Sequence, residues 1–317
     1  MPTGDLWALI DTGSPSTYFL WKDWFEEEYG EEACTFPGIG CYTCPTPCQP
    51  HNPFWITYLK GPSVRVFLYR GTVPLSSVNV SDLQFGLACG QQPPEELCQS
   101  VLGLRFHPEV FGRIPILQQL VSRSPKVIGA KVFALYLSQT PQEYAHYGEL
   151  LLGGGDRRLY KRDLRYVRFD DSSKYIVKLS SIQIGEATRT RRENVDLYID
   201  TGTNAFLLDQ RRYDILIESV KREAARSGVT VTWNDILTRW TANCTHLDAL
   251  PLVRFWLGTE DVPLNLTPRS YVHTSRDICY INVEPFPTCV LPVQALVGNY
   301  FEFRPDEGQI GFGEAVS

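Results

Sequence analysis

The stretch Leu9-Ile10-Asp11-Thr12-Gly13-Ser14 has a close counterpart later in the chain, Tyr198-Ile199-Asp200-Thr201-Gly202-Thr203. In both copies an apolar run, typical of a buried strand, leads directly into a carboxylate, a threonine and a glycine. A single Asp-Thr-Gly turn after a strand is common and indicates no more than a loop. Two copies, each after its own apolar strand, favour one catalytic site shared by the two halves of the chain.

The chemistry of this motif follows from its position at the end of a strand. A carboxylate placed where burial is expected is costly unless hydrogen-bond donors surround it. The glycine of each copy lets the backbone turn sharply and bring an N–H group toward the carboxylate. Hydroxyl groups that can donate or accept nearby belong to Thr12, Ser14, Thr201 and Thr203.

These motifs and the chain around them resemble the pepsin-like aspartic proteases, and the resemblance runs over nearly the whole sequence. It implies an all-β fold with a few short helices, in which two lobes flank a central cleft and each lobe supplies one Asp loop. By this resemblance Asp11 and Asp200 are the catalytic pair, and the threonines that follow them join the two loops. Ser14 and Thr203 are expected to hydrogen-bond the carboxylates.

The expected chemistry is that of two carboxylates in contact. They cannot both ionise cheaply, so the pair shares one proton, and the dyad of this family is the usual worked example. The ionised member acts as general base on a water, and the protonated member hydrogen-bonds the scissile carbonyl oxygen. This mechanism needs neither a metal nor a cofactor, and we expect none.

The resemblance also predicts the lobes and the strands that cross beneath the Asp loops. We expect residues 1–170 to form the first lobe and residues 171–317 the second, without a flexible linker. Val101-Leu102-Gly103-Leu104 matches the strand that crosses beneath the first Asp loop. Beneath the second loop, Leu296-Val297-Gly298 with a deletion after it competes with Val290-Leu291-Pro292, in which proline replaces the glycine.

A lid over the cleft is expected at Trp55-Ile56-Thr57-Tyr58 followed by Gly61-Pro62-Ser63, which resembles the family's flap hairpin. Tyr58 then matches the flap tyrosine that excludes water from the substrate. The segment departs from the family at Leu59, where glycine is usual, and at Tyr18, where the tyrosine's usual tryptophan partner would fall. A plain hairpin with a core tyrosine is the alternative.

Length, charge and motif content exclude several classes of protein. A chain of 317 residues is long enough for two domains with sizeable cores. The net charge of −6 and the short, scattered basic runs give no sign of nucleic-acid binding. No P-loop, dinucleotide fingerprint or Gly-x-Ser-x-Gly elbow is present, and no apolar run reaches membrane-spanning length.

Nine cysteines are present, four of them in the Pro-rich segment 34–48. Zinc binding by the Cys-x-x-Cys of this segment is one interpretation, and disulfides of a surface insertion are the one we favour. Cys89 and Cys98 are near in sequence and are candidates for a pair. The resemblance assigns Cys244 and Cys279 to the disulfide of the second lobe. An odd count leaves one thiol over.

The cysteines and three N-glycosylation sequons, at Asn79, Asn243 and Asn265, bear on the cellular compartment of the protein. Together they favour the secretory pathway, with a secreted, vacuolar or lysosomal glycoprotein as the product. The start of the sequence has no signal peptide. Pepsin-like enzymes carry a further strand or two before the first Asp loop, so we expect a leader and a pro-segment to have preceded Met1.

The sequence therefore predicts an aspartic endopeptidase that hydrolyses polypeptides at acidic pH, binds pepstatin-type inhibitors and is a monomer. The alternative is a catalytically inactive homologue whose cleft binds a peptide or a protein, because a fold does not guarantee a function. The presence of both Asp11 and Asp200 favours the enzyme. The short N-terminus and the altered flap favour the alternative.

Overall fold

The computed structural model describes residues 6–76, 78–106, 113–138, 146–169, 174–275 and 278–316. In these residues the chain is mainly β-sheet with a few short helices, which confirms the predicted fold class. The chain divides into two compact units, Met1–Val127 and Ile128–Ser317. The lobe boundary predicted near residue 170 falls outside the described residues.

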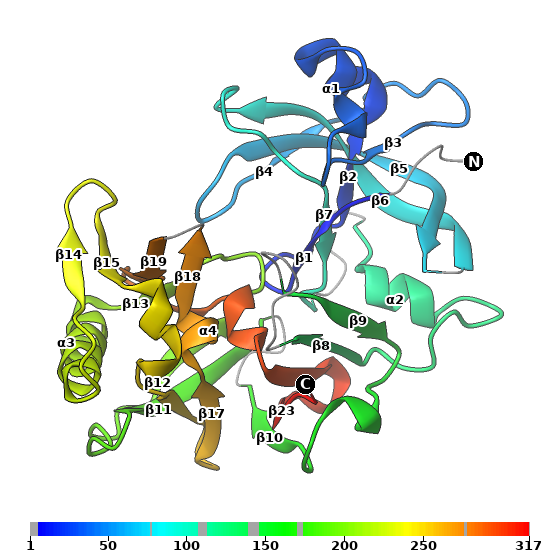
Figure 1. Ribbon diagram of the computed structural model, residues 1–317. Coiled ribbons are helices and arrows are strands. Elements are labelled where there is room, and N and C mark those ends of the chain that lie inside the picture. The colour runs from blue at the N-terminus through cyan, green and yellow to red at the C-terminus, as the bar shows by residue number, and fades with distance from the viewer. Residues whose placement is uncertain are drawn as a thin grey trace. The chain divides into compact units, whose positions relative to one another are not determined.

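The first unit is built on one sheet with neighbours in the order β1-β7-β2-β6-β5-β4, and β3 pairs with β2. The long antiparallel hairpin of β5 and β6 is drawn in cyan in Figure 1. Aromatic and aliphatic side chains fill the core of this unit, including Tyr18, Leu20, Phe25 and Val66. The elements are β1 (Leu9–Asp11), β2 (Tyr18–Trp21), α1 (Lys22–Tyr29), β3 (Cys41–Tyr42), β4 (Phe54–Ile56), β5 (Ser63–Leu75), β6 (Val78–Gln92), β7 (Val101–Gly103) and α2 (Ile116–Val121), with a short 3-10 helix at Ala33–Thr35.

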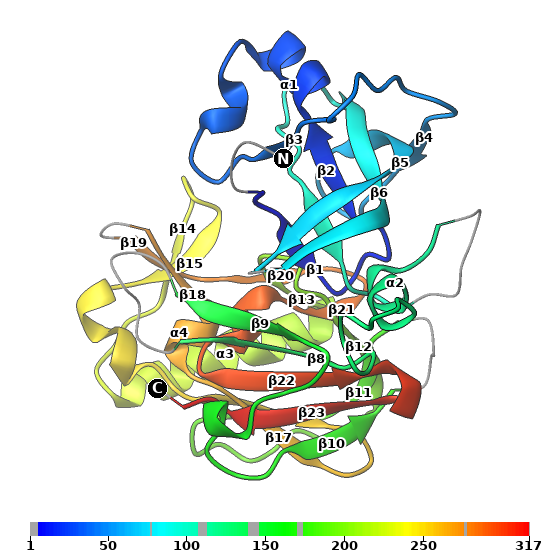
Figure 2. The same cartoon turned by 90° about the vertical axis from the view of Figure 1, so that its right-hand side faces the viewer.

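The second unit contains a five-stranded sheet in the order β10-β23-β22-β8-β9. Figure 2 shows β22 and β23 side by side, with β8 and β10 next to them. This sheet joins the segment before residue 169 to the C-terminal strands, which places both in one unit. Its strands are β8 (Phe133–Leu137), β9 (Gly148–Leu152), β10 (Arg165–Arg168), β22 (Asn299–Arg304) and β23 (Gln309–Glu314).

Two further sheets complete the second unit, one in the order β17-β16-β11-β12-β21-β13-β20 and one in the order β14-β15-β19-β18. The first of them carries the second Asp loop, which follows β12. The strands are β11 (Ile176–Ile184), β12 (Val195–Ile199), β13 (Phe206–Leu208), β14 (Thr232–Asn234), β15 (Arg239–Ala242), β16 (Val253–Leu257), β17 (Val262–Leu266), β18 (Val272–Ser275), β19 (Ile278–Ile281), β20 (Val283–Pro285) and β21 (Cys289–Leu291).

A helix follows the second Asp loop, α3 (Gln210–Arg226), and α4 (Pro268–Tyr271) is a single turn. Asp209 caps α3, because its Oδ1 accepts a hydrogen bond of 3.1 Å from the Arg212 N–H. The apolar face of α3 is buried at Leu216, Ile217, Val220 and Ala224. Short 3-10 helices lie at Arg157–Leu159, Cys244–Ala249, Val293–Leu296 and Pro305–Glu307.

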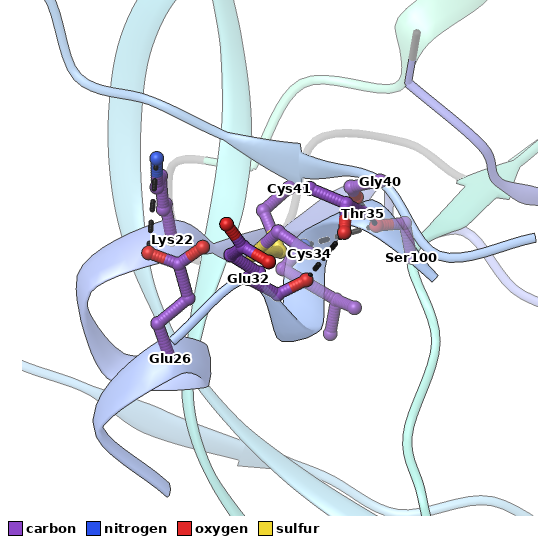
Figure 3. The surroundings of a disulfide bond; sticks show 9 residues. Lys22, Glu26, Glu32, Cys34, Thr35, Gly40, Cys41 and Ser100 are labelled. Carbon is purple, nitrogen blue, oxygen red and sulfur yellow. Dashed lines mark hydrogen bonds and ion pairs between the residues drawn. A yellow bond between two sulfur atoms is a disulfide. The ribbon is translucent and has the colours of Figure 1, made fainter. Parts of the chain in front are cut away.

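Three disulfides join Cys34 to Cys41, Cys44 to Cys48 and Cys244 to Cys279. The disulfide interpretation of the Pro-rich segment is confirmed, and the zinc interpretation is wrong because bonded sulfurs have no thiolate to offer a metal. Figure 3 shows the Cys34–Cys41 bridge beside Ser100, whose hydroxyl donates to the Gly40 carbonyl at 3.5 Å.

The suggested pair of Cys89 and Cys98 is wrong, since both are free thiols. Cys89 is the extra residue of a β-bulge, where Gly90 and Ala88 face consecutive residues of β5. Cys98 is buried in the core of the first unit instead. Cys289 is also free, so three of the nine cysteines stay unbonded, not one.

The described part of the chain contains neither a candidate membrane span nor a candidate metal site. No helix there is long and apolar enough to cross a membrane. No group of three or more His, Cys, Asp or Glu side chains there is arranged to hold a metal ion.

Candidate active site

The first Asp loop rests on a parallel strand pair. β1 pairs with β7 so that Asp11 lies opposite Gly103, as the match of Val101–Leu104 to a crossing strand predicts. The Leu104 N–H donates to the Asp11 carbonyl at 2.8 Å. A Cβ atom at Gly103 would lie 2.5 Å from the Ser16 carbonyl oxygen, so the close approach of loop and strand requires glycine here.

Asp11 is buried, with 4% of the residue exposed, and its carboxylate is held by its own loop. Its Oδ1 accepts hydrogen bonds from the Gly13 N–H at 2.8 Å and the Ser14 N–H at 2.9 Å. Two backbone donors on one oxygen favour the charged form of a buried carboxylate. Thr12 and Ser14 are buried as well, and the Ser14 hydroxyl accepts a hydrogen bond from the Ser16 N–H at 3.2 Å.

Tyr58 lies against this loop. Its hydroxyl donates a hydrogen bond of 3.1 Å to the hydroxyl of the buried Tyr18, which stands where the family has tryptophan. The pKa of Tyr58 is raised to about 12, chiefly by burial and also by the negative charge of Asp11, although its hydrogen bonds with Tyr18 and Ser14 act in the opposite direction. The phenol is therefore neutral at every pH at which a protease works. Tyr58 therefore packs against the hydrophobic core of the first unit and also lies next to the first Asp loop.

The rest of the predicted flap forms the turn between β4 and β5. Gly61 adopts a φ of +92°, a conformation that side chains disfavour, so the turn has its glycine here and not at position 59. The Ser63 hydroxyl donates to the Thr57 hydroxyl at 3.3 Å. Leu59 is 61% exposed and so packs little against the rest of the unit.

The second Asp loop also follows a parallel pair, formed by β12 and β21. Tyr198 lies opposite Val290 and Ile199 opposite Leu291, and the Asp200 N–H donates to the Leu291 carbonyl at 3.0 Å. The crossing segment is therefore Val290-Leu291-Pro292. The competing assignment to Leu296-Val297-Gly298 is wrong, because that segment leads from a 3-10 helix into β22.

The carboxylate of Asp200 is half-buried and has donors on both oxygens. The Gly202 N–H donates to Oδ1 at 2.9 Å, and the Thr203 hydroxyl donates to Oδ2 at 3.1 Å. Thr201 is buried. Both loops therefore place the glycine N–H on the carboxylate, whereas the next residue donates its backbone N–H in the first loop and its hydroxyl in the second.

Two groups near the loops were not among the predicted site residues. The Arg105 guanidinium donates from Nη1 to the Gly13 carbonyl at 3.1 Å, next to Asp11. In the second unit the buried Asn282 amide donates to the Asn204 carbonyl at 2.6 Å and to the Gln294 side chain at 2.5 Å. Arg105 could have been predicted as a site residue, because it directly follows the predicted crossing strand. Nothing in the sequence around Asn282 indicates a role near the second loop.

The chain is similar in sequence to a known protein family and to several individual proteins. The family model for eukaryotic aspartyl proteases matches residues 2–315. Renin-2 of Mus musculus is 23% identical over 83% of this chain, and cathepsin D of Gallus gallus is 24% identical over 83%. Gastricsin of Macaca fuscata fuscata is 23% identical over 99%. The chain spans 65% of the length of the renin-2, 66% of the cathepsin D and 81% of the gastricsin.

Proposed function

Because the chain belongs to the eukaryotic aspartyl protease family, we propose that it is an aspartic endopeptidase in which Asp11 and Asp200 activate one water together. The observation that supports this most is the repeated local geometry. Each unit holds an Asp-Thr-Gly loop over a parallel crossing strand, and each carboxylate accepts a hydrogen bond from its glycine N–H at 2.8 or 2.9 Å.

The reaction follows from two carboxylates that share one proton. The ionised carboxylate removes a proton from the water as it attacks the peptide carbonyl carbon. The protonated carboxyl group donates to the developing oxyanion, and a proton then passes to the leaving nitrogen as the C–N bond breaks. The singly protonated pair is the working form, so we propose an acidic pH optimum.

Tyr58 is proposed as the lid residue of this site. It already contacts Tyr18 and the first Asp loop within one unit, and the turn at Gly61 lies exposed beyond it. A tyrosine at this place shields the carboxylates from bulk water once substrate is bound. Leu59, exposed at the same turn, is available to contact a peptide side chain.

We further propose that the protein is a glycosylated monomer of the secretory pathway and that it acts on polypeptides. Three disulfides fit an oxidising compartment. The asparagines of the three sequons, Asn79, Asn243 and Asn265, are all exposed, as glycan attachment requires.

The test is cleavage of a denatured protein at roughly pH 3 to 6, with and without pepstatin. We expect cleavage that pepstatin abolishes, and an Asp200→Asn variant that has lost at least about a thousandfold in kcat/KM. Asp196→Asn is the matched control, because Asp196 lies nearby in β12 but forms an exposed ion pair with Lys178. A folded wild-type chain that neither cleaves nor binds pepstatin would favour the peptide-binding homologue.

A further inference from the structure

We infer that Arg105 is a positioning residue that stabilises the ionised form of Asp11 through the peptide group between Gly13 and Ser14. The inference rests on the proposed function, because it concerns which carboxylate of the pair carries the negative charge. The contacts on which it rests lie within the first unit.

The contacts form a short chain that ends on the carboxylate. Arg105 Nη1 donates to the Gly13 carbonyl oxygen at 3.1 Å. The same peptide group carries the Ser14 N–H, which donates to Asp11 Oδ1 at 2.9 Å. Guanidinium, peptide and carboxylate are therefore connected in series by hydrogen bonds.

This series of hydrogen bonds strengthens the one from the Ser14 N–H to Asp11. A cation on a carbonyl oxygen polarises the peptide group and makes its N–H a stronger donor, and hydrogen bonds in a chain reinforce one another. A bond from a guanidinium is itself stronger than one between neutral groups. Because arginine stays protonated at every working pH, the support for the charged Asp11 is permanent.

The side chain of Arg105 is not needed merely to hold the loop backbone in place. The Arg105 N–H already donates to the Ser14 carbonyl at 3.0 Å, and the Leu104 N–H donates to the Asp11 carbonyl at 2.8 Å. These bonds persist in any variant that keeps the main chain. What the guanidinium adds is a positive charge on the peptide that donates to Asp11.

The second loop has a neutral group at the corresponding place. Gly103 lies opposite Asp11, and Pro292 follows the residue opposite Ile199, so Gln294 matches Arg105 in position. The Gln294 side chain accepts a hydrogen bond from Asn282 and carries no charge. The first loop therefore has a cation where the second loop has a neutral amide, which favours the negative charge on Asp11.

The tyrosines that interact electrostatically with Asp11 supply no charge in acid. They are Tyr18 in β2 and Tyr58 in the flap turn. Burial raises the pKa of Tyr18 far above its ordinary value and that of Tyr58 to about 12. Both phenols stay neutral in the acidic range, so the acidic limb of activity is expected to respond to Arg105.

The experiment compares the pH profiles of kcat and kcat/KM for the full chain and four variants. Arg105→Ala removes the guanidinium, Arg105→Gln keeps a neutral donor, and Arg105→Lys restores a positive charge. Arg123→Ala is the matched control, since Arg123 also donates from its guanidinium to a backbone carbonyl, that of Asp82, at 2.7 Å. The melting temperature of each variant reports on structural damage.

For Arg105→Ala and Arg105→Gln we expect the acidic limb of kcat/KM to move up by about half a pH unit or more. Their activity on that limb falls about three- to tenfold, while KM stays within about twofold. Arg105→Lys moves the limb back toward the wild-type position, and Arg123→Ala leaves it unchanged.

An acidic limb that stays in place in Arg105→Ala overturns the inference, even if the melting temperature falls, because the role is then only structural. The inference is also overturned if Arg105→Gln keeps the acidic limb at the same pH as Arg105→Lys. A positive charge at this position is then not required. A wild-type chain without activity at any pH contradicts the proposed function itself, and the inference falls with it.

Discussion

The Thr203 hydroxyl donates a hydrogen bond to Asp200 in the second loop, at 3.1 Å from Oδ2. We predict that Thr203→Val, which removes the hydroxyl at nearly constant volume, lowers kcat/KM about tenfold, because a hydrogen bond that orients the Asp200 carboxyl group is lost. Thr203→Ser keeps the hydroxyl and is the matched control. Wild-type kcat/KM in the valine variant, measured on a peptide substrate, would show that the orientation of Asp200 does not depend on this bond.

Tyr58 has a polar contact that can be removed without changing its ring. We predict that Tyr58→Phe, which cuts the bond to the Tyr18 hydroxyl, lowers kcat/KM about five- to tenfold by loosening the lid. Tyr69→Phe removes a hydroxyl from β5 in the same unit and is expected to leave kinetics unchanged. Equal effects of the two changes would contradict a special role for Tyr58.

Gly103 belongs to the pair of β1 and β7 that carries the first loop, where a Cβ would lie 2.5 and 2.7 Å from two backbone oxygens. Backbone atoms cannot move aside as a flexible side chain can. We therefore predict that Gly103→Ala lowers the free energy of unfolding by about 2 kcal/mol or more and abolishes cleavage. Gly129→Ala, where no atom lies within 4 Å of the added methyl, is the control. Chemical denaturation checks both.

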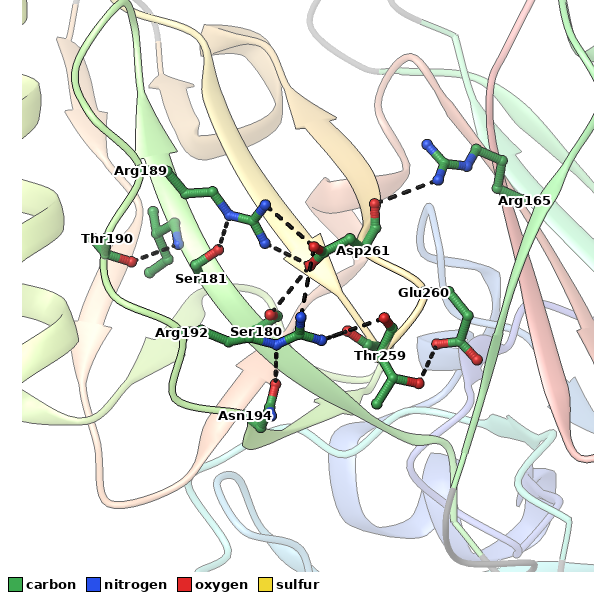
Figure 4. A network of polar contacts seen from close by, with 12 residues as sticks. Arg165, Ser180, Ser181, Arg189, Thr190, Arg192, Asn194, Thr259, Glu260 and Asp261 are labelled. Carbon is green, nitrogen blue, oxygen red and sulfur yellow. Dashed lines mark hydrogen bonds and ion pairs between the residues drawn. The ribbon is translucent and has the colours of Figure 1, made fainter.

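The elements of the second unit are tied together by an ion-pair network around Asp261, shown in Figure 4. The Asp261 carboxylate pairs with Arg189 at 2.6 Å and with Arg192 at 3.7 Å, and Ser180 donates to it at 3.3 Å. The hydrogen bond from Arg189 is the largest cause of a pKa of Asp261 below its ordinary value. The network links the hairpin between β11 and β12 to the turn before β17.

This network has a pH dependence of known sign. A carboxyl group whose pKa is lower in the folded state stabilises the fold above its unfolded pKa and loses that effect as the pH falls through its folded pKa. We predict that Asp261→Asn lowers the free energy of unfolding by about 0.5 to 1 kcal/mol at pH 7, since the pair is partly exposed. The difference from wild type should shrink as the pH falls below the ordinary pKa of an aspartate, about 3.9. Urea unfolding at pH 7 and in acid checks this, and an undiminished difference in acid would contradict it.

Several elements could be predicted because their signals are local. The Asp loops, the crossing strand at Val101–Gly103 and helix α3 each combine an apolar pattern with a turn or cap residue that specifies its own geometry. The strand beneath the second loop could not be assigned, because Pro292 stands where the glycine signal was expected.

Other features depend on the tertiary fold. Cys89 and Cys98 are nine residues apart in sequence, yet one lies at a bulge and the other faces the core. Nearness in sequence therefore says little about pairing when a bulge shifts the direction of a side chain. The contact of Arg105 with Gly13 likewise requires two segments that only the parallel pairing of β1 and β7 brings together.

At the scale of the whole molecule, the proposal depends on one relation between the two units. Each has its own sheet, its own crossing strand and its own carboxylate, and the proposed reaction needs one ionised and one protonated carboxyl group at the same time. Catalysis by this chain therefore requires that the two Asp loops meet.

The most direct test is a crystal structure of the chain with pepstatin bound. We predict that carboxyl oxygens of Asp11 and Asp200 lie about 3 Å apart, with the central hydroxyl of the inhibitor between them in place of the water. Carboxyl groups well beyond contact, or an inhibitor bound to one unit alone, would contradict the shared site.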